Sequence, residues 1–193
     1  MISPSEKLPL SIQPDQLLIR RMRDADVPGI MEIESVSFGS HHWSEESFIN
    51  EMKNYLARYY SLVDKRDSRL IGYCGFWAVF DEAHVTTVAV RPEYRRNALG
   101  EVQLIHMMDQ CMGQTIRWMT LEVRTSNYGA QNLYYKYGFS SAGTRPKYYQ
   151  DNEEDALIMT TPDINSEPYR KLYRKNKEAL IDRIGGFPEG MGS

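Results

Sequence analysis

The chain has 193 residues and a mass of 22.4 kDa, with 41% apolar and 25% charged residues, which is ordinary for one globular domain. Its formal net charge is −3, from 23 basic and 26 acidic side chains, and this argues against broad, sequence-independent binding of nucleic acid. The longest uncharged apolar run, residues 71–80, is half as long as a membrane span requires.

The N-terminal third predicts one strand and two helices. Residues 1–16 contain three prolines and little periodicity, so we expect a flexible arm there. A short strand is predicted over residues 17–22. A helix then follows Asp24, which suits an N-cap. A second helix follows Ser44, because apolar residues recur at every fourth position over 48–56.

The middle of the chain changes from strand to helical periodicity and back. Extended runs over residues 59–65, 70–80 and 83–90 are separated by short polar turns, which predicts an antiparallel meander. Apolar residues have helical spacing over 99–113, and residues 118–123 read as a strand again. Because strand, helix and strand form a crossover, the two strands that flank the helix are expected to be parallel.

The last third completes a mixed α/β sheet with flanking helices. The expected elements are a helix over 127–137, strands over 142–149 and 156–160, a linker over 162–168 and an amphipathic helix over 169–184. We therefore divide the chain into an arm (1–16), one α/β domain (17–161) and a linker with a C-terminal helix (162–193).

The segment between the third extended run and its helix has the features of an anion site. A small-residue turn that opens a helix exposes unpaired backbone N–H groups, and the helix dipole adds positive potential. Arg95 and Arg96 stand beside this turn, so the segment suits a pyrophosphate. It matches neither a Walker loop nor a dinucleotide fingerprint. An ordinary turn with solvated arginines explains the same residues equally well.

Two further side chains are candidates for proton transfer. Glu122 interrupts an apolar strand near its C-terminal end, where ligands gather in α/β crossovers, and a carboxylate there can act as a general base. Tyr134 lies on the next helix, and its phenol could return a proton to a leaving thiolate. Taken singly, the two residues are better explained as a strand-edge glutamate and a core tyrosine.

Taken together, these segments resemble a known family. Arg95-x-x-Ala98-x-Gly100 after a strand resembles the pyrophosphate loop of the GNAT N-acetyltransferases. More narrowly, the chain resembles the RimI-type bacterial ribosomal-protein alanine N-acetyltransferases in the runs LEVRTSNYGAQNLYYKYGF, GTRPKYY and EDALIM and in His42-Trp43-Ser44. The resemblance covers roughly residues 17–160.

The resemblance implies a GNAT fold, whose parallel strand pair splays apart, and acetyl transfer from acetyl-CoA to the N-terminal α-amino group of a protein such as ribosomal protein S18. It implies that Glu122 is the general base and Tyr134 the general acid, with no metal. The implied cofactor contacts are Val88, Ala89, Val90, Arg95, Arg96, Asn97, Ala98, Leu99, Gly100, Glu101 and Asn127. The implied acceptor contacts are Trp43, Tyr148 and Tyr149.

One residue departs from the family pattern. Ala98 stands where the family has the first glycine of the loop. Its methyl group either crowds the pyrophosphate or requires a negative φ, whereas a position that is already helical tolerates alanine at little cost. The substitution therefore puts the affinity for the cofactor in question, but not the fold.

Three functions follow from these observations. The first is an Nα-acetyltransferase for protein N-termini. The second is a GNAT enzyme for a lysine side chain or a small-molecule amine. The third, motivated by Ala98, is an acyl-CoA-binding module without catalysis. Glu122 and Tyr134 together favour an enzyme.

The remaining polar and sulfur-containing residues add expectations about environment and partners. Cys74 and Cys111 lie in apolar stretches, which fits packed, reduced thiols in the cytoplasm. The histidines show no metal-ligand spacing. Residues 170–177 include five basic side chains, which a solvated helix face explains; contact with ribosomal RNA or an acidic partner is the alternative. Neither a membrane nor a specific nucleic-acid sequence is an expected partner.

Overall fold

The computed structural model describes residues 12–38 and 43–191, in which seven strands form one sheet in the order β1-β2-β3-β4-β5-β7-β6. The strands are β1 (Leu17–Arg21), β2 (Ala57–Asp64), β3 (Arg69–Val79), β4 (Glu82–Val90), β5 (Trp118–Arg124), β6 (Ser140–Tyr149) and β7 (Glu154–Thr160). Neighbouring strands are antiparallel except β4 and β5, which are parallel. The predicted mixed, mostly antiparallel sheet with one parallel crossover is confirmed.

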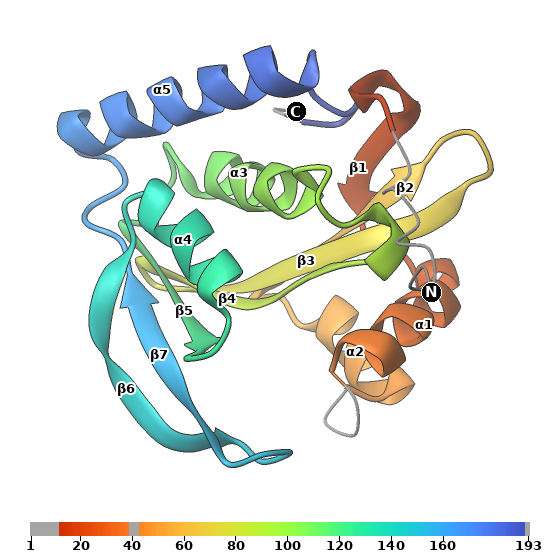
Figure 1. Cartoon of the computed structure of the whole chain (residues 1–193), viewed down its shortest axis with the longest axis horizontal. Coiled ribbons are helices and arrows are strands. Elements are labelled where there is room, and N and C mark those ends of the chain that lie inside the picture. The colour runs from red at the N-terminus through yellow and green to blue at the C-terminus, as the bar shows by residue number, and fades with distance from the viewer. Residues whose placement is uncertain (1–11, 39–42, 192–193) are drawn as a thin grey trace, which may run out of the picture.

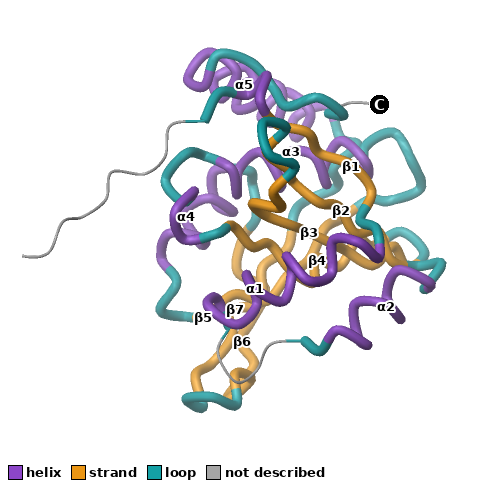
Figure 2. Tube along the Cα trace, turned by 90° about the vertical axis from the view of Figure 1, so that its right-hand side faces the viewer, coloured by secondary structure: helices purple, strands orange, loops and turns teal. Residues whose placement is uncertain are grey.

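Helices cover both faces of this sheet (Figures 1 and 2). They are α1 (Val27–Ser37), α2 (Glu45–Lys53), α3 (Leu99–Cys111), α4 (Tyr128–Lys136) and α5 (Glu167–Ile184). The larger apolar cluster joins α3, α4 and α5 to one face, and the smaller cluster joins α1 and α2 to the other. Because successive side chains of a strand point to opposite sides, the central strands β2, β3 and β4 contribute to both clusters. None of the described helices combines the length and apolar composition that a bilayer crossing requires.

The helix boundaries depart from the prediction at three places. Asp24 opens a short 3-10 turn, Asp24–Asp26, and does not cap α1. Leu56 lies in the turn before β2 and not on α2. α5 begins inside the predicted linker, because Pro168 fits the first turn of a helix. Most of the predicted arm (1–11) and His42 lie outside the described residues.

The C-terminal helix α5 is part of the main core. Tyr169, Tyr173 and Leu180 are buried in the larger cluster. The hydroxyl of Tyr169 donates to the carbonyl of Tyr137 on the α4 side (2.8 Å). Gly185 ends the helix with a φ of +82°, a conformation that glycine adopts without strain. α5 therefore stabilises α3 and α4, which flank the parallel strand pair.

His106 on α3 is a buried histidine with an expected effect on acid stability. Its side chain is 2% exposed, and within the described residues neither ring nitrogen has a hydrogen-bond partner. Burial lowers its pKa to about 4, against the opposing charge of Asp109. The unfolded chain therefore binds this proton more tightly than the folded chain does. Between pH 6.5 and pH 4 we expect the free energy of unfolding to fall by about 3 kcal/mol through this group.

The test is urea unfolding of the wild type and of His106→Leu at pH 7, 5.5 and 4.5. Because leucine removes two buried polar atoms, the variant should be as stable as the wild type at pH 7 and lose less stability by pH 4.5. Carboxylates with lowered pKa values, such as Asp26 and Glu101, contribute to the loss mainly at lower pH, in both proteins. Equal losses in the two proteins would show that His106 is not responsible.

Candidate active site

The parallel strands β4 and β5 part halfway along their length. Their register runs from Glu82↔Trp118 to Val85↔Leu121 and stops there, although both strands are described in full. β4 continues beside β3 and β5 continues beside β7, so each keeps its outer partner. Figure 1 shows the two strands diverging. Backbone N–H and C=O groups on the facing edges therefore have no partner across this split, and the predicted splayed pair is confirmed.

A bulge on β4 lies where the strands part. On β3, Gly75 pairs with Thr87 of β4, and the next residue, Phe76, pairs with Val85. Thr86 lies between these two pairs and has no partner on β3. The Thr86 hydroxyl donates to the carbonyl of Gly75 (3.1 Å) and lies 2.8 Å from the hydroxyl of Tyr59. A Cβ at position 75 would lie 2.3 Å from the Tyr59 ring, so this position needs glycine. Because a bulge bends and twists its strand, it accounts for the divergence of β4 from β5.

Glu122 is the first residue of β5 beyond the paired stretch. Its neighbours Leu121 and Val123 lie in the cluster beneath α3 and α4, so Glu122 points to the opposite face, on the side of α1 and α2. The carboxylate is only 6% exposed. Its Oε2 lies 3.1 Å from Nε2 of His84, and its Oε1 lies 3.0 Å from the guanidinium of Arg145.

These contacts stabilise the charged form of Glu122. The hydrogen bond with His84 is the largest cause and lowers the pKa, burial raises it, and the charges of His84 and Arg145 lower it further. The net effect is a pKa below the ordinary value of a glutamate. Glu122 is therefore a carboxylate at neutral pH, which is the form that accepts a proton.

His84 is a residue of this site that the sequence analysis did not identify. Its Nδ1 lies 3.1 Å from the hydroxyl of Thr120, and this hydroxyl donates to Glu82 (2.5 Å). The His84 ring stacks on Trp77 with 6.0 Å between ring centroids. The indole of Trp77 in turn donates to Glu51 on α2 (2.7 Å). The imidazole is thus held on its ring face and at both nitrogens.

Tyr134 lies on the opposite face of the sheet, in the cluster that also holds Leu121 and Val123 of β5. It lies on α4, which begins directly after β5 and is capped by the side chain of Asn127, an acceptor for the Ala130 N–H (3.1 Å). Tyr134 is buried in the larger cluster against Phe139, with 5.6 Å between ring centroids. Burial raises its pKa to about 12, so the phenol stays protonated at neutral pH. The two candidate proton-transfer groups therefore lie on opposite sides of the split sheet.

The turn before α3 presents backbone N–H groups to open space. Arg96 and Ala98 have φ values of +66° and +60°, so the chain turns sharply into the helix. The first helical hydrogen bond of α3 runs from the Val102 N–H to the Ala98 carbonyl (3.0 Å), which leaves the N–H groups of residues 99–101 outside the helical ladder. A Cβ at Gly100 would meet no protein atom within 4 Å. This end of α3 fits an anion.

Most side chains of this turn have partners within the protein. Arg95 donates to the Val90 carbonyl (3.0 Å) and to Ser37 (3.1 Å), and the Asn97 amide donates to the Tyr94 carbonyl (3.1 Å). The Glu101 carboxylate is buried and contacts Lys136, Tyr137 and Arg183. The backbone of the turn, with the exposed side chain of Arg96, is what remains available to an anion.

Ala98 adopts neither of the conformations that the sequence analysis considered. It has left-handed backbone angles as the N-cap of α3, and its partly buried methyl group packs against the larger cluster. Alanine pays about 1 kcal/mol for these angles. The methyl group therefore strains the backbone without standing over the free N–H groups.

We expect Ala98→Gly to change acetyl-CoA affinity by less than about threefold, because the lost methyl group faces the core. Gly100→Ala is the matched variant: its new methyl group enters the open space beside the free N–H groups, and we expect it to weaken binding by about tenfold or more. Calorimetry with acetyl-CoA measures both. A tenfold gain in affinity for Ala98→Gly, or none lost in Gly100→Ala, would contradict this account of the turn.

The free edge of β4 consists of Val88, Ala89 and Val90. Val88 and Val90 pack against the larger cluster, and Ala89 belongs to the smaller one. Packing on both faces holds this stretch of β4 in place. Because the pairing with β5 ends at Val85, the backbone edge of residues 88–90 borders the split.

The predicted acceptor contacts lie on the same face as Glu122 or at its rim. The Trp43 ring packs against Tyr59, with 6.2 Å between centroids. Tyr148 and Tyr149 end β6 and form an edge-to-face pair at 5.1 Å. The pKa of Tyr148 is raised by burial and by the charge of Glu122. That of Tyr149 is raised by burial and, to a smaller extent, by nearby groups that include Glu122. Both tyrosines thus lie within electrostatic reach of Glu122.

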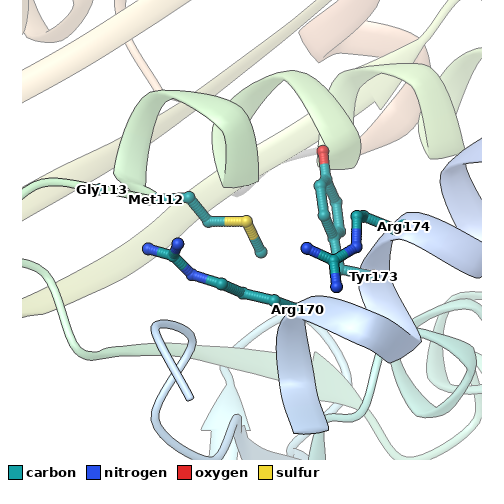
Figure 3. Close-up of a pocket in the computed structure, with 5 residues that line it drawn as sticks. All are labelled: Met112, Gly113, Arg170, Tyr173 and Arg174. Atoms are coloured by element: carbon teal, nitrogen blue, oxygen red, sulfur yellow. The ribbon is translucent and has the colours of Figure 1, made fainter. Parts of the chain in front are cut away.

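A metal centre and a surface pocket are two further kinds of site. In the described part of the chain, no three His, Cys, Asp or Glu side chains are grouped closely enough to hold a metal ion. A pocket of about 260 Å³ lies between the end of α3 and α5 (Figure 3). It is lined by Met112, Gly113, Arg170, Tyr173 and Arg174. Three of these residues belong to the basic segment 170–177, and none lies on β4, β5 or α4, the elements that border the split.

Comparison with known proteins connects this arrangement to a family. Residues 27–139, more than half of the chain, match the family model described as Acetyltransferase (GNAT) family. A Bacillus subtilis (strain 168) protein, provisionally named a [ribosomal protein bS18]-alanine N-acetyltransferase, is 45% identical over 142 residues, which cover 73% of this chain and 92% of that protein.

Solved structures agree with the sequence comparison. The crystal structure of the ribosomal-protein-S18-alanine N-acetyltransferase from Escherichia coli has a TM-score of 0.69 and 30% identity, covering 78% of this chain and 97% of that one. The PaiA N-acetyltransferase from Thermoplasma acidophilum, solved in complex with coenzyme A, has a TM-score of 0.63 and covers 76% of this chain and 98% of that one. Its 19% identity supports the common fold alone.

Proposed function

The chain belongs to the acetyltransferase (GNAT) family, and on this premise we propose that it acetylates the N-terminal α-amino group of ribosomal protein bS18 or of closely similar N-termini. It is an acyltransferase that uses acetyl-CoA as co-substrate. The names of the Bacillus subtilis and Escherichia coli relatives support this acceptor. The observation that carries the mechanism is the split between β4 and β5, with Glu122 on one face of the sheet and Tyr134 on the other.

Glu122 acts as the general base in this proposal. An α-amino group has a pKa of about 7.7–8.0, so most of it is ammonium at pH 7 and cannot attack a carbonyl carbon. The buried carboxylate of Glu122 accepts the proton, directly or through one water, and leaves a neutral amine facing the split.

The residues of the split fit the co-substrate. The N–H groups of residues 99–101 and the exposed side chain of Arg96 would hold the pyrophosphate, and the free edge at 88–90 would pair with the pantetheine arm. Asn127 caps α4 through its oxygen, which leaves its amide N–H groups as donors. Bound acetyl-CoA supplies an acetyl thioester. A backbone N–H near Val88–Val90 would polarise its carbonyl group.

Tyr134 acts as the general acid in this proposal. Its phenol is protonated at every working pH because burial raises its pKa to about 12. It donates its proton toward the thiolate sulfur as the thioester breaks, and the second proton that the nitrogen loses as the amide forms passes to water. Residues on two faces of the sheet thus deliver the two proton transfers, and no covalent enzyme intermediate is needed.

Two finer points belong to the same proposal. Contact with the ribosome would run through the basic residues of α5, of which Lys171 and Lys175 are exposed, whereas Arg174 and Lys177 pair with Glu167 and Asp109. An enzyme that modifies ribosomal proteins would work in the cytoplasm, as the reduced cysteines also suggest.

The test is an acetylation assay with purified protein, acetyl-CoA and three peptides. One has the bS18 N-terminal sequence with a free alanine amine, one has the same sequence with a blocked N-terminus, and one has a blocked N-terminus and an added lysine. Thiol release and peptide mass report turnover. Modification of the free N-terminus alone supports the proposal. Modification of the lysine peptide indicates the side-chain enzyme, and acetyl-CoA binding without turnover of any peptide indicates a binding module.

A further inference from the structure

Both oxygens of the Glu122 carboxylate are covered by basic side chains. His84 lies 3.1 Å from Oε2 and the Arg145 guanidinium lies 3.0 Å from Oε1, and the carboxylate is only 6% exposed. Direct contact between an acceptor amine and either oxygen is therefore obstructed unless one of these two side chains moves. The contacts of His84 and Arg145 with the rest of the protein decide which side chain moves.

The His84 side of the carboxylate is fixed. The imidazole is bound to Thr120 through Nδ1 and stacked on Trp77, and Trp77 is itself anchored to Glu51 on α2. The His84 side chain is 28% exposed. To release Oε2, the ring would have to leave all of these contacts together.

The Arg145 side is loosely held. Its side chain is 55% exposed, and within the described residues its ion pair with Glu122 is joined only by a contact with the Tyr148 ring, 5.6 Å from the centroid. The β6–β7 register is interrupted directly after Arg145, between Arg145 and Tyr149. Arg145 can therefore leave Oε1 by a rotation of its side chain, without breaking any hydrogen bond of the core.

We propose that Oε1 of Glu122 is the binding position of the acceptor's α-ammonium group, and that Arg145 is an internal cation that occupies this position until the acceptor displaces it. The exchange replaces one cation by another beside the same carboxylate, so the charge balance of the site is kept. His84 is a positioning residue that holds Oε2 throughout. This inference rests on the proposed function and adds how the acceptor is recognised.

Proton transfer gives an independent reason for the exchange. With Arg145 and His84 in place the pKa of Glu122 lies below its ordinary value, far from that of an amine, which makes Glu122 a weak base. The groups that face it are His84 from β4 and Arg145, Tyr148 and Tyr149 from β6, with Glu82 of β4 behind His84. Once the ammonium has replaced Arg145, its own deprotonation removes the positive charge at Oε1, whereas a guanidinium would keep its charge there. The pKa of Glu122 during proton transfer is therefore higher after the exchange than with Arg145 in place.

The test is steady-state kinetics of Arg145→Gln with the free-alanine peptide. Removing the internal cation should lower the KM for the peptide by about two- to fivefold, the range of an exposed ion pair, and leave the KM for acetyl-CoA unchanged. Arg145→Lys retains a cation and should behave more like the wild type. An unchanged peptide KM in Arg145→Gln would overturn the proposal, because Arg145 would then not compete with the acceptor. An increased peptide KM would also overturn it, because Arg145 would then bind the acceptor.

Two further measurements separate this role from a structural one. In Arg145→Gln the vacated position should bind methylguanidinium, so this ion should inhibit competitively against the peptide and more strongly than in the wild type; equal inhibition of both proteins would count against the site. Arg117→Gln is the matched control, because Arg117 is 53% exposed and pairs with Asp163 at 2.9 Å, away from Glu122. Absence of turnover by the wild type in the same assay would instead refute the proposed function.

Discussion

Glu122→Gln is expected to lower kcat by about 10²–10⁴-fold, the usual loss when a positioned general base is removed. The amide keeps the size of the carboxylate and can still bind Arg145 or His84 through its oxygen, so the fold of the split should persist. Acetyl-CoA binding should be nearly unchanged, because the residues that fit the co-substrate lie on α3, β4 and α4. Stopped assays give kcat, and calorimetry gives the acetyl-CoA affinity.

The pH dependence of this variant makes the test specific to the role of a base. Raising the pH from 7 to 9 deprotonates the α-amino group in solution, since its pKa is about 7.7–8.0. The variant no longer needs a base for that fraction of the acceptor, so its deficit against the wild type should shrink as the pH rises. A deficit that stays constant from pH 7 to 9, or a variant with wild-type kcat at pH 7, would remove Glu122 from this role.

The strands of the sheet could be predicted from the sequence because each one is marked by a local pattern of residues. Extended apolar runs over 59–65, 70–80 and 83–90 predicted the meander, and the change to helical spacing after Val90 predicted the parallel crossover. Errors occur where a boundary depends on tertiary contacts. Leu56 has the spacing of a helical residue, but its carbonyl accepts from Ala78 on β3, which holds it in the turn.

A candidate proton-transfer group could also be predicted from the sequence where a charged residue interrupts an apolar strand. Glu122 is the one charged side chain among the apolar residues 121–123, and that conflict is visible without a structure. Its contacts are not. The register that pairs His84 with Thr120 brings His84 next to Glu122 on the same face, and strand periodicity alone does not fix a register. The sequence did contain one signal for His84. It is a polar residue between the apolar Ala83 and Val85, so it lies on the opposite face of the strand from them.

The split itself depends on a feature that no local pattern encodes. The bulge at Thr86 follows from which residues of β3 face β4, and from the room that Gly75 leaves for Tyr59. Ala98 illustrates the same limit. Sequence reasoning considered a clash with the pyrophosphate or a helical position, whereas the backbone is left-handed and the partly buried methyl group packs against the larger cluster.

Tyr134→Phe is expected to lower kcat by about 10²–10⁴-fold while leaving stability nearly unchanged. The phenol is buried in an apolar cluster, burial alone accounts for its raised pKa, and no hydrogen bond to it is found within the described residues, so phenylalanine fills the same space without orphaning another group. A loss of activity would therefore report on the chemistry. Tyr135→Phe is the control, because Tyr135 lies on the same helix and is 47% exposed.

The leaving group distinguishes a proton donor from a residue that only shapes the site. A thiolate of a more acidic thiol needs less help from a donor, because it is more stable without a proton. The deficit of Tyr134→Phe should therefore be smaller with an acetyl thioester of an aromatic thiol than with acetyl-CoA, when both are assayed with the same peptide. An equal deficit with both thioesters would mean that Tyr134 affects packing around the split, and that thiolate departure is assisted by another group.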